Sequence, residues 1–485
     1  PRCRLRVSIG RMKKYLFMKK LVSFLLIGSV FSLSSALVSC GGDDDSVDSP
    51  IVNPDPIVPE EPSKNEAMTP LEQKEYLDVI ARGFMDKTPA SDFNEISKLY
   101  NHISNTYTDN YDWDVVGDWG SEIFESLKES LGTTNKEQEK YSWGEYNYIY
   151  TNYKALVMAS NFKGHFKAIG NKWELSKADD LQFIFSDQHG KECVLKLVTS
   201  GNVKKVFIGN IDEWVDYNYD YSNDYYISND YYDRTQLTVG VPENIVVTLT
   251  QGGSQVVKVT VKLNIGDLSN DKFDLSKNQL TASTLVELNN GYKFNVSQVA
   301  YNGNNKTSVS FDMSKNGESL ASVAFSSDIS GIPSCNIDAM VSGNIDEEDF
   351  NNSNMKNVYV KLDIMGKLQI QGTLSDVRKF TDYINEADDN DDDEKTFKSY
   401  VNQANSLANF NLFYDGKSTK QATVTLEAFE EESWNGMKYW YMEPMLNFYD
   451  GSSYSTFDAF FNDKDFKSVI DALEKLADNY ASLIN

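Results

Sequence analysis

The sequence predicts an α+β protein that is dominated by antiparallel β-meander sheets, with an N-terminal helical module and C-terminal helices. Apolar residues follow helical spacing through residues 69–135, and from about residue 145 their period switches to two. Turns, rather than helix-length segments, separate most of the predicted strands. We therefore expect hairpins and meanders, and the pattern excludes βαβ crossovers and a parallel sheet.

The helical module over residues 69–135 begins at a capping box. Thr69 stands at the N-cap, Pro70 at the first helical position and Glu72 at the third. A second helix is expected to begin near Pro89, and a third to end at Gly132. The module precedes all of the predicted strands.

The antiparallel β region is predicted over residues 140–375. Between Gln255 and Ile265, valine, leucine and isoleucine alternate with lysine, threonine and asparagine, which indicates one buried and one solvated face. This strand pairs with residues 245–250 across Gly252-Gly253. Turns of the Asn-Gly and His-Gly type predict further hairpins at 181–186 with 192–198, 284–288 with 292–300, and 307–313 with 318–325.

The C-terminal region, residues 376–485, mixes both element types. Helices are expected at 376–386 and 395–408, and strands at 409–415, 420–429 and 437–448. An amphipathic helix closes the chain, with Asp463 as its N-cap. Its apolar positions are Phe466, Val469, Ile470, Leu473, Leu476, Ala477, Tyr480 and Leu483.

Residues 1–39 contain the features of a lipoprotein signal peptide: two lysines, an apolar run from residue 21 to 37, and small residues before a cysteine. The segment Leu37-Val38-Ser39-Cys40 resembles a bacterial lipobox. The resemblance implies that Cys40 is diacylated on sulfur and begins the mature protein, which the lipid chains would hold stably on a membrane.

Three acidic residues follow the lipobox, namely Asp43, Asp44 and Asp45. They resemble the export tag of Bacteroidota-type lipoproteins, which implies display on the outer face of the outer membrane. The alternative is a solvated acidic spacer. Residues 40–68 form a Pro- and Asp-rich tether, and up to this tether the chain resembles Bacteroidota-type surface-exposed lipoproteins.

The charge of the chain excludes some functions. The net charge is −26, and removal of residues 1–39, which hold eight basic and no acidic residues, makes it −34. Such a charge opposes binding to nucleic acid. About 420 residues follow the tether. A single hydrophobic core usually holds fewer residues than this, so we expect at least two packed units.

The cysteines and histidines do not form a metal or catalytic pattern. Cys193 and Cys335 remain after processing, and they are either bridged or two buried thiols. The three histidines lack Cys or His partners at ligand spacing, so we predict no metal, no cofactor and no catalytic residue. The acidic run 388–394 fails the EF-hand pattern and is expected to be a solvated loop between helices.

One segment suggests a binding site. From Asp216 to Tyr221, Asp or Asn alternates strictly with Tyr. In a strand, this pattern segregates rings from carboxylate and amide acceptors, which suits binding of a glycan. The predicted ligand residues are Trp214, Tyr217, Tyr219 and Tyr221. The alternative is a polar surface hairpin. A second aromatic group, Trp434, Tyr439, Trp440 and Tyr441, is expected in the core.

Together these observations predict a non-enzymatic outer-membrane surface lipoprotein that binds an extracellular glycan or protein. Its partners are then the membrane, through the lipid anchor, and that extracellular ligand. The alternative is a lipid or lipoprotein carrier in which a curved antiparallel sheet forms an apolar cavity. A hydrolase of an unrecognised type is the third possibility.

Overall fold

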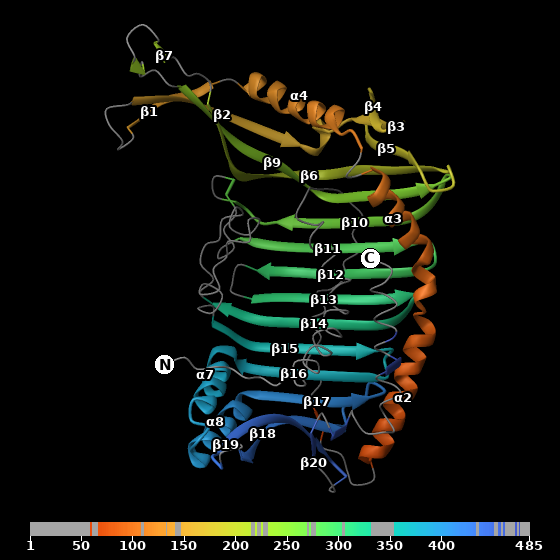
Figure 1. The fold of residues 1–485 in the computed structure, drawn as a ribbon, viewed down its shortest axis with the longest axis vertical. Coiled ribbons are helices and arrows are strands. Elements are labelled where there is room, and N and C mark those ends of the chain that lie inside the picture. The colour runs from red at the N-terminus through yellow and green to blue at the C-terminus, as the bar shows by residue number, and fades with distance from the viewer. Residues whose placement is uncertain are drawn as a thin grey trace.

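The computed structural model shows one large sheet with helices along its margins (Figure 1). It describes residues 59–60, 66–107, 111–131, 133–140, 147–214, 219–220, 225–226, 231–268, 271–272, 278–302, 306–330, 354–432, 436–450, 454–456, 459–460, 471–472 and 475. The predicted α+β class, with a large antiparallel sheet preceded by helices, is confirmed at this level.

The first helix begins as predicted. Thr69 and Glu72 form the capping box, in which the Thr69 N–H donates to the Glu72 carboxylate at 2.8 Å. The helical elements are α2 (Pro70–Lys87), η1 (Ala90–Phe93), α3 (Asn94–Tyr107), α4 (Asp114–Leu131), η2 (Ala159–Asn161), α7 (Val377–Asp388) and α8 (Glu394–Leu407).

Strands make up most of the described chain. The first ten are β1 (Thr133–Lys140), β2 (Asn147–Met158), β3 (Gly164–Ile169), β4 (Lys172–Ser176), β5 (Leu181–Ser186), β6 (Glu192–Trp214), β7 (Tyr219–Asp220), β8 (Tyr225–Tyr226), β9 (Tyr231–Gln251) and β10 (Ser254–Ile265). The others are β11 (Gln279–Leu288), β12 (Tyr292–Asn302), β13 (Lys306–Lys315), β14 (Glu318–Ser330), β15 (Asn354–Ile364), β16 (Leu368–Asp376), β17 (Ala408–Tyr414), β18 (Ala422–Glu432), β19 (Lys438–Phe448) and β20 (Tyr454–Thr456).

From β9 to β20 each strand pairs antiparallel with the next, so the main sheet is a long meander. The predicted hairpins β5–β6, β9–β10, β11–β12 and β13–β14 are all confirmed. The β13–β14 turn shows why. Asn316 and Gly317 have φ angles of 54° and 85°, the left-handed conformation that a tight hairpin turn requires.

The exclusion of parallel pairing was wrong for two pairs of strands. β2 runs parallel to β9, and β3 runs parallel to β5. The sequence argument considered only helices as crossover connections. Here strands make the connections, because β3 to β8 intervene between β2 and β9.

The main sheet has one apolar face. Directly paired residues lie on the same side of a sheet, and two rows of such pairs cross it. One row is Val247, Val259, Val286, Phe294, Met313, Ala321, Ile364, Leu368 and Tyr414. The next is Ile245, Val261, Thr284, Val296, Phe311, Val323, Leu362, Ile370, Leu412, Ala422 and Phe448. We call this side the apolar face.

The opposite side of the sheet is polar. Glu287, for example, lies between Lys258 and Lys293 on the neighbouring strands, at 3.5 and 2.8 Å. These two lysines lower the pKa of the Glu287 carboxyl, Lys293 most strongly. The two faces therefore alternate in polarity as in other antiparallel sheets, although Gln369, Gln371 and Asn411 on the polar side of β16 and β17 are buried.

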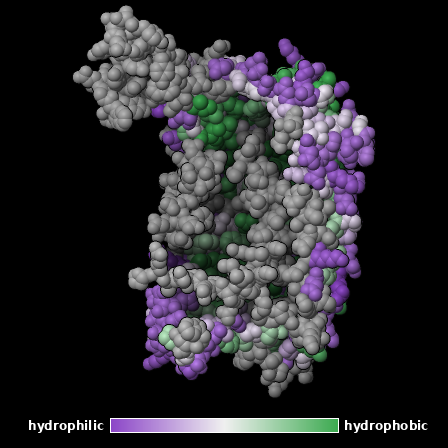
Figure 2. All heavy atoms as spheres, viewed as in Figure 1, coloured by the Kyte–Doolittle hydropathy of each residue, from purple (hydrophilic) through white to green (hydrophobic). Residues whose placement is uncertain are grey.

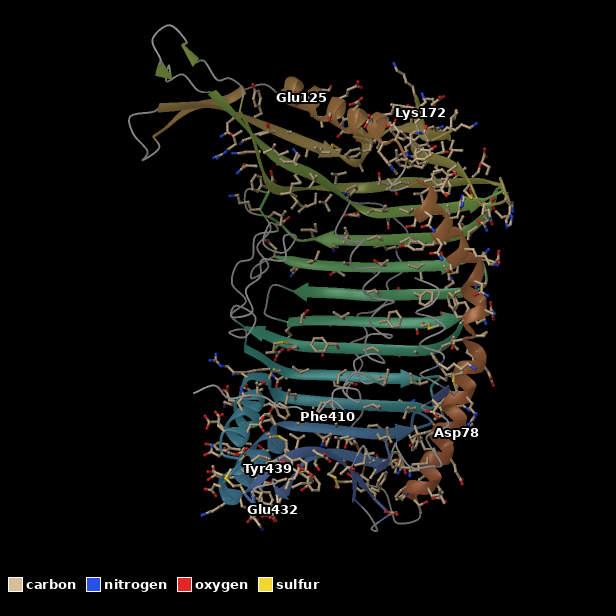
Figure 3. The ribbon with its side chains drawn as sticks, viewed as in Figure 1. Asp78, Glu125, Lys172, Phe410, Glu432 and Tyr439 are labelled. Carbon is tan, nitrogen blue, oxygen red and sulfur yellow. The ribbon has the colours of Figure 1, made fainter. Side chains whose placement is uncertain are left out.

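Helices pack on the apolar face near its margins. Phe397 and Val401 of α8 contact a cluster of apolar-face and neighbouring residues that includes Leu426 and Trp440. At the other strand ends Leu77 of α2 packs against a buried cluster that includes Leu446. Figure 2 shows described apolar residues at the floor of this face and hydrophilic ones along α2 and α3. Outward-facing side chains of α2 include Asp78, which pairs with Arg82 at 2.9 Å (Figure 3).

A buried polar group fixes the helices to the sheet. The Tyr292 side chain is fully buried, and its hydroxyl lies 2.8 Å from Asp92 Oδ2. The Lys315 ammonium donates to the same oxygen at 2.6 Å and, with help from Tyr292, lowers the pKa of the Asp92 carboxyl. Burial, and then Asp92, raises the pKa of Tyr292. This group holds the α2–α3 junction on β12 and β13.

The tether meets the sheet at one end of the meander. The Glu60 N–H donates to the Ser418 carbonyl at 3.0 Å, and the Lys420 N–H donates to the Glu60 carbonyl at 3.0 Å. Glu60 thus forms a short parallel bridge to the β17–β18 connection.

Candidate ligand-binding arm

Two unusually long strands leave the main sheet and form an arm. In β9, residues 244–251 pair with β10, whereas residues 231–240 pair with β2. β6 pairs with β9 along both parts. The distal halves of β6 and β9 therefore join β2 and β1 in a four-stranded ribbon, in the order β6–β9–β2–β1. This arm projects from the top of the sheet in Figure 1.

The predicted ligand residues lie at the distal end of this arm. Trp214 is the last residue of β6, and Tyr219 lies in β7, where it pairs with Tyr226 of β8. Tyr217 and Tyr221 lie outside the described residues. The structure thus places Trp214 and Tyr219 at the two ends of one short connection.

The backbone pairing adds two residues that the sequence interpretation missed. Trp214 pairs with Tyr232 of β9, and Tyr232 pairs with Tyr150 of β2. The three residues occupy one row across three strands and hence one face of the arm. Tyr148, two residues before Tyr150, belongs to the same face. The signal was present in the sequence, because residues 146, 148 and 150 are tyrosines at strand spacing.

Polar residues flank this aromatic row. Glu137 of β1 pairs with Tyr150, so it extends the row by one strand. The next row on the same face contains Asp212, Arg234 and Asn152. Three aromatic positions in one row, with Glu137 and Asp212 at neighbouring positions of the same face, combine residue types that suit apolar ligand surfaces and hydroxyl groups. The row crosses two strand spacings, about 10 Å.

The second aromatic group divides between the two faces of β19. Trp440 packs against α8, and the Lys398 ammonium lies 4.2 Å from the centre of its ring. Tyr441 stacks on Phe429 of β18 with ring centroids 5.7 Å apart. Tyr439 precedes them on the same strand (Figure 3), and Trp434 lies outside the described residues.

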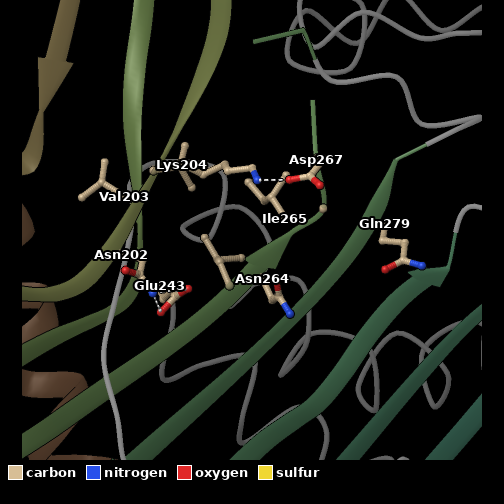
Figure 4. Close-up of a pocket in the computed structure, with 11 residues that line it drawn as sticks. Asn202, Val203, Lys204, Glu243, Asn264, Ile265, Asp267 and Gln279 are labelled. Atoms are coloured by element: carbon tan, nitrogen blue, oxygen red, sulfur yellow. Dashed lines mark hydrogen bonds and ion pairs between the residues drawn. The ribbon is translucent and has the colours of Figure 1, made fainter. Parts of the chain in front are cut away.

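A cavity of about 460 Å³ opens near the base of the arm (Figure 4). Val241, Leu263 and Ile265 contribute apolar walls. Lys204 donates to Asp267 at 2.9 Å and lowers the pKa of this carboxyl. Glu243 also lines the cavity, so its wall carries one ammonium and two carboxylates.

The histidines have structural partners. The His102 Nε2 lies 2.9 Å from the Ser186 carbonyl, which ties α3 to β5. The His165 Nε2 lies 2.6 Å from Asp180, whose pKa is lowered chiefly by the Lys196 ammonium. Ser176 beside His165 donates to its backbone carbonyl at 3.3 Å, so this hydroxyl is not activated by the ring. His189 lies in the β5–β6 turn.

The acidic run after α7 connects two helices, as expected. Asp393 caps α8 by accepting from the Lys395 N–H at 3.0 Å. Burial, and then Asp391 and Asp389, raises the pKa of the Asp388 carboxyl. In the part of the chain that the structure describes, no group of three or more His, Cys, Asp or Glu side chains could hold a metal ion.

Several predicted sites lie wholly or partly outside the described residues. Cys40 and Asp43–Asp45 are among them. Cys193 is fully buried, and burial raises the pKa of its thiol. Cys335 lies outside the described residues, so the bridge stays a prediction. Among the described helices, none is long and apolar enough to cross a membrane.

The described residues define an α+β protein with one 18-stranded sheet, from which a four-stranded ribbon with a row of aromatic residues projects. No known protein family, curated protein or solved structure matches this chain.

Proposed function

We propose that this protein is a non-enzymatic surface lipoprotein and that its arm binds an extracellular glycan. The supporting observation is the row of Trp214, Tyr232 and Tyr150 across three strands. A row that crosses strands suits an extended polymer better than a single sugar, because successive units can meet successive rings. Glu137 and Asp212 occupy neighbouring positions of the same face, and carboxylates are acceptors for hydroxyl groups.

The position of the arm supports binding away from the membrane. The tether joins at the β17–β18 connection, and eight strand spacings of about 4.8 Å separate β17 from β9 along the sheet. The base of the arm at β9 is therefore about 40 Å from β17, measured across the strands of the sheet. Glu60, at which the tether meets the sheet, and the arm therefore lie at opposite ends of the meander.

The test is a glycan-binding assay on single-ring variants. Trp214→Ala, Tyr232→Ala and Tyr150→Ala are each compared with the parent chain on immobilised polysaccharides and on oligosaccharides of increasing length. An aromatic contact contributes about 0.5–1.5 kcal/mol, so each change should weaken binding about two- to tenfold. Affinity should rise with chain length until all three positions are occupied.

The matched control is Tyr100→Ala. Tyr100 is an aromatic residue of α3 that is 49% exposed and remote from the arm. It should leave glycan binding unchanged, and all variants should keep the parental circular dichroism spectrum. Equal binding by parent and arm variants, or no polysaccharide bound by the parent chain, would contradict the proposal.

The apolar face favours a second candidate function, that of a lipid or lipoprotein carrier. Between β10 and β16 some of its residues are half-buried, among them Val259, Val286, Met313 and Leu362, whereas Val261, Val296 and Phe311 are buried. A carrier should bind a fluorescent long-chain fatty acid stoichiometrically, and the absence of binding by the purified chain would exclude it.

A further inference from the structure

The sheet divides at β9, and the cavity near the base of the arm lies at this fork. One edge of β9 pairs with β10 up to Asn244 and with β2 from Gly240 onward. Residues 241–243, between these two stretches, pair with neither β10 nor β2. Pro242 among them has no N–H group to donate to such a pairing. The cavity of about 460 Å³ opens here, and we call it the fork cavity.

Glu243, which lines the fork cavity, is a charged residue on the apolar side of β9. Side chains alternate along a strand, so Glu243 lies on the same side as Ile245 and Val247 of the apolar face. It is half-buried, and its hydrogen-bond partner is the Asn202 amide. The amide nitrogen lies 3.4 and 3.5 Å from the two carboxylate oxygens (Figure 4). These distances are long for hydrogen bonds, so the carboxylate can still accept a stronger donor.

The lysine that lines the fork cavity already has a carboxylate partner. Lys204 donates to Asp267 at 2.9 Å rather than to Glu243. Within the described residues, the carboxylate at the cavity that has no cation beside it is therefore that of Glu243. A partly buried carboxylate is stabilised by a cationic partner, whereas an anionic ligand would be repelled by the excess negative charge. The cavity thus favours a ligand with a positive charge.

The rest of the lining suits a ligand that has both a C–H surface and hydroxyl groups. Val241, Leu263 and Ile265 form apolar walls. Asn264 and Gln279 add side-chain amides, which both donate and accept hydrogen bonds. Apolar walls with a small number of polar groups are the usual composition of small-molecule sites, and the volume lies within their range of about 300–1,000 Å³.

We propose that the fork cavity binds a small hydroxylated amine, the chemical class that includes amino sugars. The ammonium group of the ligand pairs with Glu243, its C–H surface lies against Leu263 and Ile265, and its hydroxyl groups bond to the amides around them. Such a ligand contacts β6, β9 and β10 and so bridges the base of the arm and the main sheet. The inference does not depend on the aromatic row of the arm, because it uses other residues and a different ligand group.

Ligand-observed NMR titrations on the full chain test the proposal. The probes are glucosamine, glucose and glucuronate, which share a pyranose ring and carry a positive, a neutral and a negative charge. Glucosamine should bind most tightly and glucuronate most weakly. In Glu243→Gln, glucosamine should bind about tenfold more weakly, because a hydrogen bond between two charged groups is lost. The control, Glu427→Gln, makes the same change at an exposed position of β18 and should leave binding unchanged.

A second variant tests whether binding takes place in the fork cavity. Asn202 is exposed and lines the cavity, so Asn202→Trp should fill the space and abolish glucosamine binding. Trp214→Ala on the arm should leave glucosamine binding unchanged, so the two proposals can fail separately.

Three results would overturn the proposal of an amine site. They are no glucosamine binding by the parent chain, equal affinity for glucosamine and glucose, and equal glucosamine affinity in the parent and in Glu243→Gln. Parental binding by a folded Asn202→Trp would likewise contradict the location. If Asn202→Trp does not fold, the isosteric Glu243→Gln decides alone.

Discussion

Removing one hydroxyl from the buried group that fixes the helices to the sheet should measurably destabilise the protein. In Tyr292→Phe, the hydroxyl that lies 2.8 Å from Asp92 and 2.9 Å from the Lys87 carbonyl is lost. A hydrogen bond to a charged group contributes about 1.5–3 kcal/mol. Lys315 still donates to both acceptors, at 2.6 and 3.2 Å, so neither becomes unpaired.

We therefore expect a loss of about 1.5 kcal/mol, at the lower end of that range, which is about tenfold in the unfolding constant. Urea titration followed by circular dichroism measures it. The control, Tyr100→Phe, changes a side chain that is 49% exposed and should shift stability by less than about 0.5 kcal/mol. A Tyr292→Phe variant as stable as this control would refute the reasoning.

The same group predicts a pH dependence. The pKa of Asp92 is lowered in the folded protein, mainly by Lys315. A lowered carboxyl pKa contributes stability that is present above the unfolded-state pKa and is lost as pH falls through the folded-state value. The difference between the parent and Tyr292→Phe should thus be full at neutral pH and should shrink in acid. A difference that grows as pH falls would contradict the assignment.

The remaining predictions concern residues at or beyond the limits of the described chain. Cys40→Ala should abolish incorporation of labelled palmitate and release the protein from the membrane fraction; unchanged labelling would exclude the lipoprotein assignment. Replacing Asp43–Asp45 with alanine should keep the protein lipidated but shield it from protease added to whole cells, unless the acidic run is only a spacer. If Cys193 and Cys335 are bridged, the chain denatured without reductant should show no free thiol, and reductant should lower the melting temperature of the folded protein. Two titratable thiols would exclude the bridge.

Local chemistry explains which elements the sequence predicts correctly. The capping box of Thr69 and Glu72 lies within one helical turn, and the Asn316-Gly317 hairpin within one tight turn. Each is specified by a few adjacent residues whose backbone preferences are strong. The alternation of β10 is equally local, because its two faces differ in polarity along one strand.

Features that depend on distant pairing could not be predicted in this way. Tyr292 and Asp92 are 200 residues apart, and neither sequence neighbourhood indicates the other. The aromatic row needs the parallel register that sets Tyr150 beside Tyr232, and the alternating tyrosines predict strands but not their neighbours. Trp214 was identified because it stands next to the Asp/Tyr alternation, whereas Tyr150 and Tyr232 required the topology.

The sharing of β6 and β9 between the arm and the main sheet has a mechanical consequence. A chain held at Glu60 and pulled by a polymer at the arm would carry tension across the strands of the meander, from β9 to β17. The sets of hydrogen bonds between neighbouring strands would then bear the load in series. The weakest set would determine the force at which the sheet unfolds. Within the arm the pull would instead run along β6 and β9, and their many paired residues would share it in shear.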